Sequence, residues 1–323
     1  MLERQFQSEV SHDFIVVSSI WMGFIFYVFF LFLSYDISII SFKLFNIKIN
    51  QETYTPFIIF FLSLVICIYA YYEANNIKIT TIDIPNHKTR INNDSFNIVQ
   101  ISDVHLGILV GNKKLQKITD MIKKINPDLL VITGDLLDKD VNHIEELYQL
   151  LADVKPKYGK YAVTGNHEFY VGIDKSILFM KNTNITLLRN QVKIIPGIMN
   201  IVGIDDPAVK IFDKSIDTDL SQTMKDIDKN LFTLLLYHQP KDYKKAQELG
   251  VDLQLSGHTH NGQLFPFNLF VSLSYPIYKG LHKFNDFYIY ISRGTGTWGP
   301  PMRFLSPPEI TWIKVRSWEL RCL

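Results

Sequence analysis

Two long uncharged apolar stretches near the start of the chain limit its possible folds more than any other feature. The first lies between Asp13 and Asp36 and has 22 residues, and the second lies between Glu52 and Glu73 and has 20. Each is long enough to cross the roughly 30 Å hydrocarbon core of a bilayer as a helix. We therefore expect a membrane anchor in residues 1–73, with transmembrane helices over about 14–35 and 54–72, and a catalytic domain over 74–323.

A cleavable signal peptide or a buried core helix would also be apolar. The segment before the first stretch carries Glu3, Arg4 and Glu9 rather than a basic cluster, and no small-residue cleavage site follows the stretch. Core helices are rarely this long and this free of charge, so both alternatives are disfavoured.

Basic residues around the anchor favour a cytoplasmic position for the rest of the chain. Both ends of a two-helix hairpin lie on one face of the membrane. The loop between the stretches carries Lys43 and Lys48, and the outer flanks carry four basic residues: Arg4, Lys78, Lys88 and Arg90. The positive-inside rule then predicts an inner (cytoplasmic) membrane protein whose catalytic domain faces the cytoplasm.

Charge and cysteine content exclude several classes of protein. The formal net charge is +1, which gives no electrostatic reason to expect a nucleic-acid partner. The two cysteines, Cys67 and Cys322, are too few for a disulfide framework or a thiolate metal cage. Any metal must therefore be held by nitrogen and oxygen ligands.

The soluble part alternates between the periodicities of strands and helices. Strands are predicted at 77–84, 96–102, 128–133, 160–164, 185–188, 199–204, 232–237, 252–255, 287–292 and 310–315. Helices are predicted at 112–125, 141–154 and 239–249. This order predicts a layered α/β domain with a β-sandwich flanked by helices.

Polar side chains follow five of the predicted strands at the point where each strand ends. The five blocks are Asp103-Val-His105, Gly134-Asp135, Gly165-Asn166-His167-Glu168, His238 and Gly257-His258-Thr259-His260. They hold five of the nine histidines, and glycine lets the backbone turn sharply immediately before Asp135, Asn166 and His258. Each block alone is also typical of an ordinary turn, but ligand sites in α/β sheets lie beyond strand carboxyl ends, so we expect the five to converge.

In this order, the five blocks resemble the calcineurin-like metallophosphoesterase superfamily, over about residues 97–315. Three further segments, 203–206, 255–263 and 292–303, resemble its membrane-anchored branch, some members of which hydrolyse UDP-2,3-diacylglucosamine in lipid A synthesis. The resemblance implies a layered metallophosphoesterase fold preceded by the two transmembrane helices.

The resemblance also implies two divalent metal ions. One would be held by Asp103, His105 and His260, the other by Asn166, His238 and His258, and Asp135 would bridge them. A carboxylate between two cations about 3.5–4 Å apart offsets their repulsion. Imidazole and carboxylate ligands without thiolate suit Mn, Fe or Zn.

Three residues near these blocks are candidates for contact with substrate. His167 resembles the family's non-ligand histidine, a catalytic residue that hydrogen-bonds the phosphoryl oxygen or protonates the leaving group; the alternative is a structural role. Arg293 and Arg303 would bind substrate as a bidentate phosphate clamp, or would be ion-pair partners.

Four other residues have two interpretations or a supporting role. Glu168 would orient its loop. Asp205 and Asp206 would contact ligand histidines or form a simple Asp-Asp-Pro turn. Trp298 would line an apolar rim or pack beneath it.

The residues and the resemblance together predict a membrane-anchored, dinuclear metal-dependent phosphohydrolase. It would cleave a phosphodiester or diphosphate bond with a metal-activated hydroxide, and its substrate would be phosphorylated and lipid-linked, such as UDP-2,3-diacylglucosamine. One alternative is a broad phosphodiesterase acting on cyclic nucleotides, phospholipid headgroups or envelope polymers. The other is a non-catalytic membrane scaffold, which would be expected to have degraded ligands, whereas all seven are present.

Overall fold

The computed structural model describes residues 2–47, 53–88, 95–138 and 145–317, and for residues 2–12 the backbone alone. Lys48, Arg90, Cys322 and the first residues of the helix predicted at 141–154 lie outside this description.

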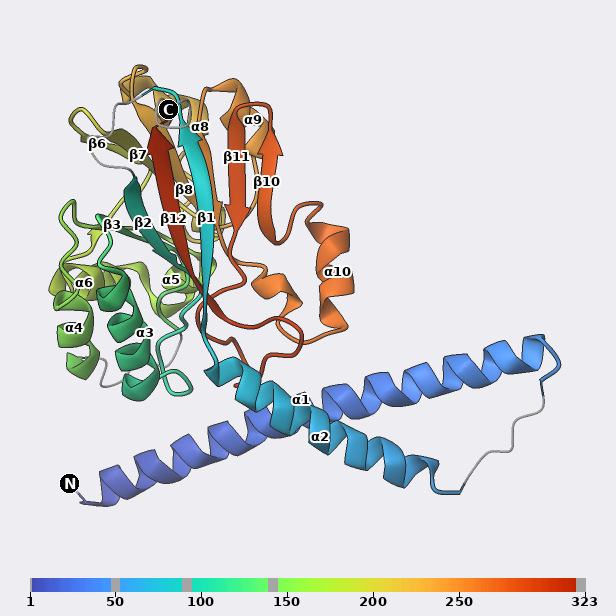
Figure 1. The fold of residues 1–323 in the computed structure, drawn as a ribbon. Helices are drawn as coiled ribbons and strands as arrows, with labels where there is room; N and C mark the ends of the chain where they lie inside the picture. The colour runs from blue at the N-terminus through green and yellow to red at the C-terminus, as the bar shows by residue number, and fades with distance from the viewer. Residues whose placement is uncertain (1, 48–52, 89–94, 139–144, 318–323) are drawn as a thin grey trace.

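Two six-stranded sheets face each other and form the centre of the molecule (Figure 1). The first sheet contains, in spatial order, β1 (Lys78–Asn86), β12 (Glu309–Ser317), β2 (Phe96–Ile101), β3 (Leu129–Thr133), β4 (Lys160–Val163) and β5 (Thr186–Leu187). The second contains β10 (Gly280–Phe284), β11 (Phe287–Ile291), β9 (Leu253–Ser256), β8 (Phe232–Tyr237), β7 (Met199–Ile204) and β6 (Gln191–Ile195).

Four strands of each sheet run parallel to one another. In the first sheet these are β2 to β5, and in the second they are β7, β8, β9 and β11. Parallel strands are covered on both faces and therefore read as unbroken apolar runs, as Leu129–Thr133 and Phe232–Tyr237 do. Their shared direction brings the carboxyl ends of each set to one edge.

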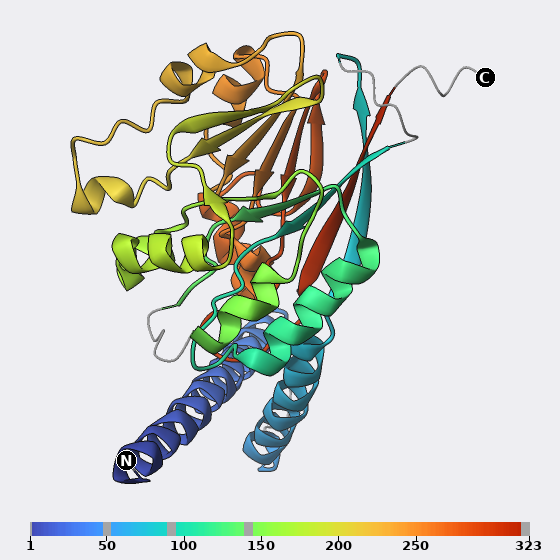
Figure 2. The same ribbon diagram turned by 90° about the vertical axis from the view of Figure 1, so that its left-hand side faces the viewer.

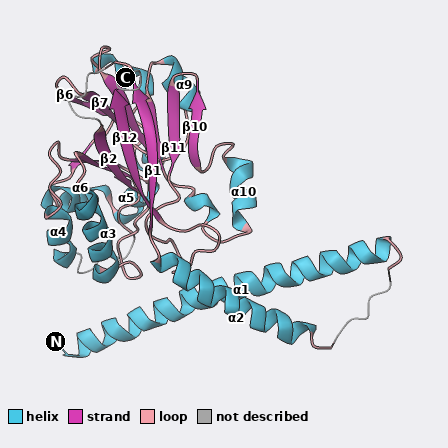
Figure 3. Cartoon of the chain, viewed as in Figure 1, coloured by secondary structure: helices cyan, strands magenta, loops and turns pink. Residues whose placement is uncertain are grey.

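Apolar side chains fill the space between the sheets and beneath the helices on either side. Ile98 and Val131 of the first sheet belong to one buried cluster with Leu234 and Leu255 of the second. The outer face of the first sheet is covered by α3 (Asn112–Ile125), α4 (Glu145–Ala152) and α6 (Ile173–Asn182). The second sheet is covered by α8 (Leu220–Thr223), the short turn η1 (Met224–Asp226) and α9 (Tyr243–Glu248). The predicted α/β class and layered sandwich are confirmed (Figure 3).

Several short elements were not predicted. They are α5 (Asn166–Val171), α6, α7 (Val209–Phe212), α8, η1, β6, the turn η2 (His260–Gly262), α10 (Phe267–Ser274) and β10. The helix predicted at 239–249 begins only at Tyr243, because Asp242 before it has a left-handed backbone with φ of 53°.

Two N-terminal helices, α1 (Leu2–Leu44) and α2 (Thr55–Asn75), are long and apolar enough to cross a membrane. Both extend from the same side of the sandwich (Figure 2). The helix α1 has 43 residues and extends beyond the predicted membrane span 14–35 at both ends, through Asp13 and Asp36. At 1.5 Å per residue its length is about 65 Å.

The two helices pack against the sandwich domain. Tyr27 of α1 and Ala70 of α2 share a buried cluster with Leu264 and Met302. The backbone N–H of Arg303 donates to the Ala70 carbonyl over 2.8 Å. The two helices are therefore part of the packed structure rather than a flexible extension of it.

Candidate metal centre

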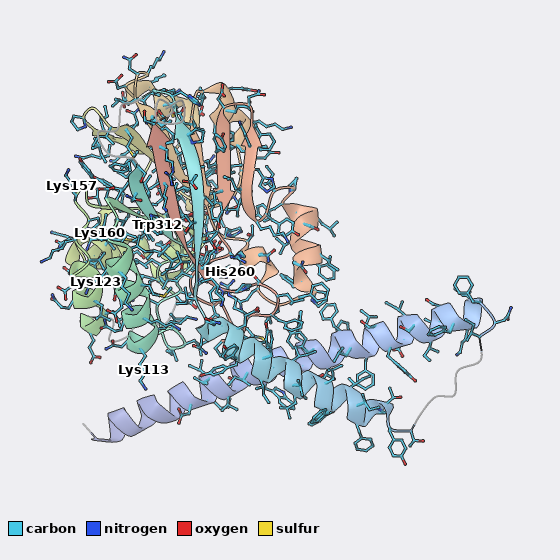
Figure 4. All side chains as sticks on the ribbon, in the orientation of Figure 1. Lys113, Lys123, Lys157, Lys160, His260 and Trp312 are labelled. Carbon is cyan, nitrogen blue, oxygen red and sulfur yellow. The ribbon has the colours of Figure 1, made fainter. Side chains whose placement is uncertain are left out.

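The five polar blocks converge at the edge of the sandwich nearest the two N-terminal helices. Figure 4 places the labelled His260 at this edge, close to α2. The structure brings together all seven residues predicted as metal ligands, and Asp103, Asp135 and His238 are almost completely buried.

The first group of donors consists of Asp103, His105 and His260. One ligand atom from each lies within 4.8 Å of the others. The Nε2 atoms of His105 and His260 are 3.2 Å apart, and His260 Nε2 is 3.3 Å from Asp103 Oδ1. These are the three residues predicted for the first metal.

The second group contains Asp135, His238, His258 and Asn166. His258 Nδ1 lies 3.2 Å from His238 Nε2 and 3.1 Å from Asn166 Oδ1. Asp135 Oδ2 is 3.2 Å from His238 Nε2 and 3.8 Å from His105 Nε2, so this oxygen lies between the groups. The position suits the predicted bridging role.

The backbone is strained at this edge. Five of the seven candidate ligands have left-handed φ angles between 50° and 69°: Asp103, His105, Asp135, His258 and His260. Non-glycine residues in this region carry a conformational cost and persist only where surrounding contacts fix them. Here the strand-end loops fix one another, since the Asp103 N–H donates to the Gly134 carbonyl and the His105 N–H donates to the Asp135 carbonyl.

The glycines before the ligands have two different physical roles. Gly134 has a φ of 85° and makes the predicted sharp turn. Gly257 has no such conformation, but a Cβ there would lie 2.0 Å from Ser102 Oγ and 2.2 Å from Asp103 Oδ2. Glycine is needed here because the loop of Gly257 lies very close to the loop of Ser102 and Asp103. The sequence instead suggests a sharp turn as the reason.

Glu168 holds the loop that carries Asp135. Its Oε2 accepts the N–H groups of Asp135 and Gly165 at 2.9 and 2.6 Å, and its Oε1 accepts those of Leu136 and Leu137 at 2.8 and 3.2 Å. Burial raises the pKa of Glu168 to about 7, whereas the four N–H donors stabilise its ionised form. This geometry matches the expected orienting role.

The charge states of His105, His258 and His260 suit cations, whereas Asp135 outweighs burial and raises the pKa of His238, so a cation would displace a proton from that ring. Burial lowers the pKa of His105 and of His258 to about 3, so both rings are neutral and offer lone pairs. Burial raises the pKa of Asp103 and of Asp135, but His260 and His238 outweigh it respectively and leave both carboxylates ionised. Buried carboxylates need positive partners, and nitrogen and oxygen donors without thiolate are those that divalent Mn, Fe and Zn accept. The donor set therefore fits metal ions.

His167 faces the centre from the side. Its ring lies 4.6 Å from the His105 ring and 6.1 Å from the Trp298 ring, and its Nδ1 is 3.1 Å from Asp138 Oδ1. Burial lowers the pKa of His167, but the hydrogen bond to Asp138 and the charge of Asp135 outweigh it, so the pKa is raised. Asp138 was missed from the sequence, although it is only three residues after Asp135.

The contacts of Arg293 and Arg303 lie within the protein, and for Arg293 they match the alternative of an ion-pair partner rather than the phosphate clamp. Arg303 is fully buried and donates to the carbonyls of Gly296, Arg293 and His260. One of its NH2 groups also lies 3.1 Å from His260 Nδ1. Arg293 forms an ion pair with Glu309, with a distance of 3.0 Å from its Nε to Oε2. Both guanidinium groups are thus committed to the protein, and Arg303 positions the His260 loop.

The acidic pair after β7 also serves the protein framework. Asp205 forms a bidentate ion pair with Arg189. Asp206 accepts the Ala208 N–H over 2.8 Å and the Gln239 side-chain amide over 2.9 Å. The first of these bonds is the predicted turn, and the second holds the residue that follows His238.

A cavity of about 330 Å³ opens over the donor groups. His167 and Trp298 line it, and Trp298 is 56% exposed, so the rim interpretation fits the tryptophan. Its other walls include Phe26 of α1 and Phe267 and Val271 of α10. These three residues were not predicted.

The two-sheet α/β fold, with a buried cluster of imidazole and carboxylate donors at its strand ends, defines a class of protein: the metal-dependent phosphoester hydrolases. Residues 96–262 match the family model of the calcineurin-like phosphoesterases, and the chain belongs to this family.

Two named relatives, from Aquifex aeolicus and Danio rerio, agree with this assignment. An uncharacterized metallophosphoesterase of Aquifex aeolicus is 35% identical over 222 residues, which cover 68% of this chain and 85% of that protein. A transmembrane protein with metallophosphoesterase domain from Danio rerio is 33% identical over 74% of this chain, but the match spans only 57% of that protein. A putative 5'-nucleotidase structure from Staphylococcus aureus is similar over 69% of this chain and 54% of its own, with a TM-score of 0.44 and 12% identity.

Proposed function

We propose that this protein is a membrane-anchored hydrolase that uses two divalent metal ions to cleave a phosphodiester or diphosphate bond. The observation that carries the proposal is the position of Asp135 Oδ2 between the two donor groups. Family membership supports metal-dependent phosphoester hydrolysis. The apolar helices α1 and α2, together with the transmembrane relative, support the membrane location.

The residues of the first group would hold one ion and those of the second group the other, with Asp135 shared. Bound there, the ions would activate a water nucleophile and neutralise phosphoryl oxygens. We propose manganese or an iron-containing pair as the native metals.

His167 would act on the substrate from the cavity. Asp138 at its Nδ1 orients the ring and leaves Nε2 to hold a proton for a phosphoryl or leaving-group oxygen. Trp298, Phe26 and the α10 residues would exclude water from this position.

The finer candidate substrate is UDP-2,3-diacylglucosamine, which would place the protein in lipid A synthesis. The support for it is the resemblance of three loop segments together with the apolar cavity above the donors. The broad phosphodiesterase remains the alternative, because the donor groups themselves select only for a phosphoryl group.

The two substrates are separated by a metal-reconstituted assay of the detergent-solubilised full chain. It would be given UDP-2,3-diacylglucosamine beside bis(4-nitrophenyl) phosphate, with Mn, Fe and Zn supplied in turn. Preferential release of UMP supports the lipid nucleotide, and preferential cleavage of the aryl ester supports the broad enzyme. Absence of turnover of both by metal-loaded protein would favour the scaffold alternative.

We also propose that the catalytic domain faces the cytoplasm from the inner membrane, as the positive-inside pattern predicts. Fusions of green fluorescent protein and of alkaline phosphatase to the C-terminus test this orientation. Fluorescence is expected with the first, and enzyme activity with the second would contradict the orientation.

A further inference from the structure

The helix α10 carries an apolar surface that no part of the described chain covers. The segment 261–278 around it contains no Asp, Glu, Lys or Arg. None of the eight residues of α10 is buried, and Leu269, Phe270 and Leu273 are 57%, 51% and 83% exposed. Large apolar patches of this kind on a protein surface mark contact with a partner or a membrane.

The position of α10 indicates which partner covers it. The ring of Phe270 lies 6.3 Å from that of Phe30 on α1, the helix that is apolar enough to cross a membrane. Figure 1 shows α10 on the side of the sandwich that faces α1. The exposed surface of α10 is thus continuous with that of a helix apolar enough to cross a membrane, and its Asn268, Ser272 and Ser274 supply the polar groups of an interfacial helix.

The inner side of the same two helices lines the catalytic cavity. Phe26 of α1 and Phe267 and Val271 of α10 form its apolar wall, and His258 and His260 lie at its floor. Within the described residues that line this cavity, Asp135 is the one charged carboxylate, and neither lysine nor arginine is present. A polar nucleotide or sugar would find few partners on this wall, whereas a hydrocarbon chain would be desolvated there.

From this arrangement we infer that the site takes a membrane-resident phosphoester with a long apolar chain. The hydrocarbon chain of this substrate lies between Phe26 of α1 and Phe267 and Val271 of α10. The outer face of α10 lies in the bilayer surface. The inference rests on the proposed function, because the phosphoryl group of this amphiphile is the one placed at the metal centre.

Lipid contact is tested without any metal. The full chain is placed in nanodiscs that contain a phospholipid with a diazirine at the end of one acyl chain, and adducts are mapped by mass spectrometry after illumination. Adducts are expected in the peptide 264–275 as well as in α1 and α2. Leu273→Glu should reduce the α10 adducts by fivefold or more, whereas Leu178→Glu, at an exposed apolar position on α6, should leave them unchanged. Adducts confined to α1 and α2 would mean that α10 faces water or another protein, and would overturn the inference.

The apolar subsite is tested by a series of alkyl 4-nitrophenyl phosphates, from methyl to dodecyl, with the same full chain in nanodiscs. Each buried methylene raises binding by about fourfold at most, so kcat/KM should rise at least tenfold along the series. Val271→Asp should lower the dodecyl-to-methyl ratio by tenfold or more. Leu178→Asp should keep the ratio, which controls for partitioning of the ester into the bilayer. A flat series would overturn the subsite.

The two proposals fail in different ways. If no ester of the series is cleaved by the metal-loaded protein, the proposed function fails, and the adducts alone decide whether lipid occupies α10. If the methyl ester is cleaved without a preference for longer chains and α10 gains no adducts, hydrolysis stands and the lipid subsite is excluded.

Discussion

Asp135 is the residue on which both donor groups depend, because its Oδ2 lies within 4 Å of a histidine of each group. Asp135→Ala should therefore abolish hydrolysis and remove both metals rather than one. Metal content by plasma mass spectrometry, together with activity on an aryl phosphodiester, checks this. Asp120→Ala, on the exposed face of α3, is the matched control. Retention of one metal equivalent would show that Asp135 binds a single ion.

His167 contacts the cavity without belonging to either donor group. His167→Ala should keep the metal content and lower kcat by about 10²–10⁴, the usual effect of losing a general acid. Loss of metal in this variant would instead make His167 a ligand or a structural support of Asn166.

Asp138 acts through His167 as a positioning residue. Asp138→Asn should lower kcat less than His167→Ala does, and the double variant should be no slower than His167→Ala alone. A further drop in the double variant would mean that Asp138 contributes independently of the His167 ring.

The sequence predicts that the candidate ligands converge at one edge of the sandwich, but not which residues support them. Each ligand follows a readable strand, so its place at the sheet edge follows from chain direction alone. Asp138 has a role only because the folded chain places it at Nδ1 of His167. Phe26 lines the cavity from α1, a helix that is distant in the sequence. The burial of Arg303 was not predicted, because the residues next to it in the sequence do not indicate that backbone carbonyls surround its guanidinium group.

At the level of elements, Glu168 joins the start of α5 to the loop after β3. Glu168→Gln replaces one acceptor oxygen with an NH2 group that faces two N–H donors. Leaving buried donors unsatisfied should cost at least about 2 kcal/mol, equivalent to a fall of about 4–8 °C in Tm. Thermal unfolding of the metal-free protein measures this, with the exposed Glu146→Gln of α4 as the control. Equal Tm values would show that the loop is held by other contacts.

Two lysines of α3 hold the last turn of α2. Lys114 Nζ donates to the Ala74 carbonyl over 3.0 Å, and Lys117 Nζ donates to the Asn75 carbonyl over 2.6 Å. Burial, with repulsion from Arg303 and Lys117, lowers the pKa of Lys114 to about 7. Such contacts complement the negative end of the helix dipole and fix α2 to the catalytic domain.

The lowered pKa of Lys114 predicts a pH dependence of stability. Between pH 7 and about 10 the unfolded chain holds a proton on this lysine that the folded protein has released, so its contribution to stability rises with pH in this window. The Tm of the wild type minus that of Lys114→Met should therefore increase from pH 7 to pH 9.5 in detergent. Parallel curves for the two proteins would contradict the shift.

The elements that were not predicted from sequence periodicity are short, and their formation depends on tertiary contacts. The parallel strands are recognised as apolar runs because both of their faces meet a core, and α3 carries helical periodicity because one of its faces does. α10 has eight residues and no buried face within the protein, so no amphipathic pattern directed at a protein core identifies it. Its Phe267 and Val271 line the cavity beside Phe26 of α1, and this position is visible only in the folded structure.

At the scale of the whole molecule, the proposed anchor helix α1 forms part of the cavity wall. Phe26 lines the cavity, and Phe24 and Tyr27 pack with Leu264 and Met302 beside it. A tether would need none of these contacts. The difference can be tested by replacing residues 2–75 with an unrelated transmembrane hairpin of matched length, which keeps the protein at the membrane.

If α1 forms a wall of the site, the protein with the exchanged hairpin should keep its membrane attachment and its metal content. It should lose its preference for esters with long alkyl chains. Loss of Phe26 opens the apolar groove to water, so the dodecyl-to-methyl ratio of kcat/KM should fall by tenfold or more. A chimera that carries the foreign hairpin and restores only the α1 residues 20–30 should recover the ratio, because these residues contain the wall and its supporting contacts. A foreign hairpin that gives the wild-type ratio would reduce the anchor to a tether and assign the selectivity to α10 alone.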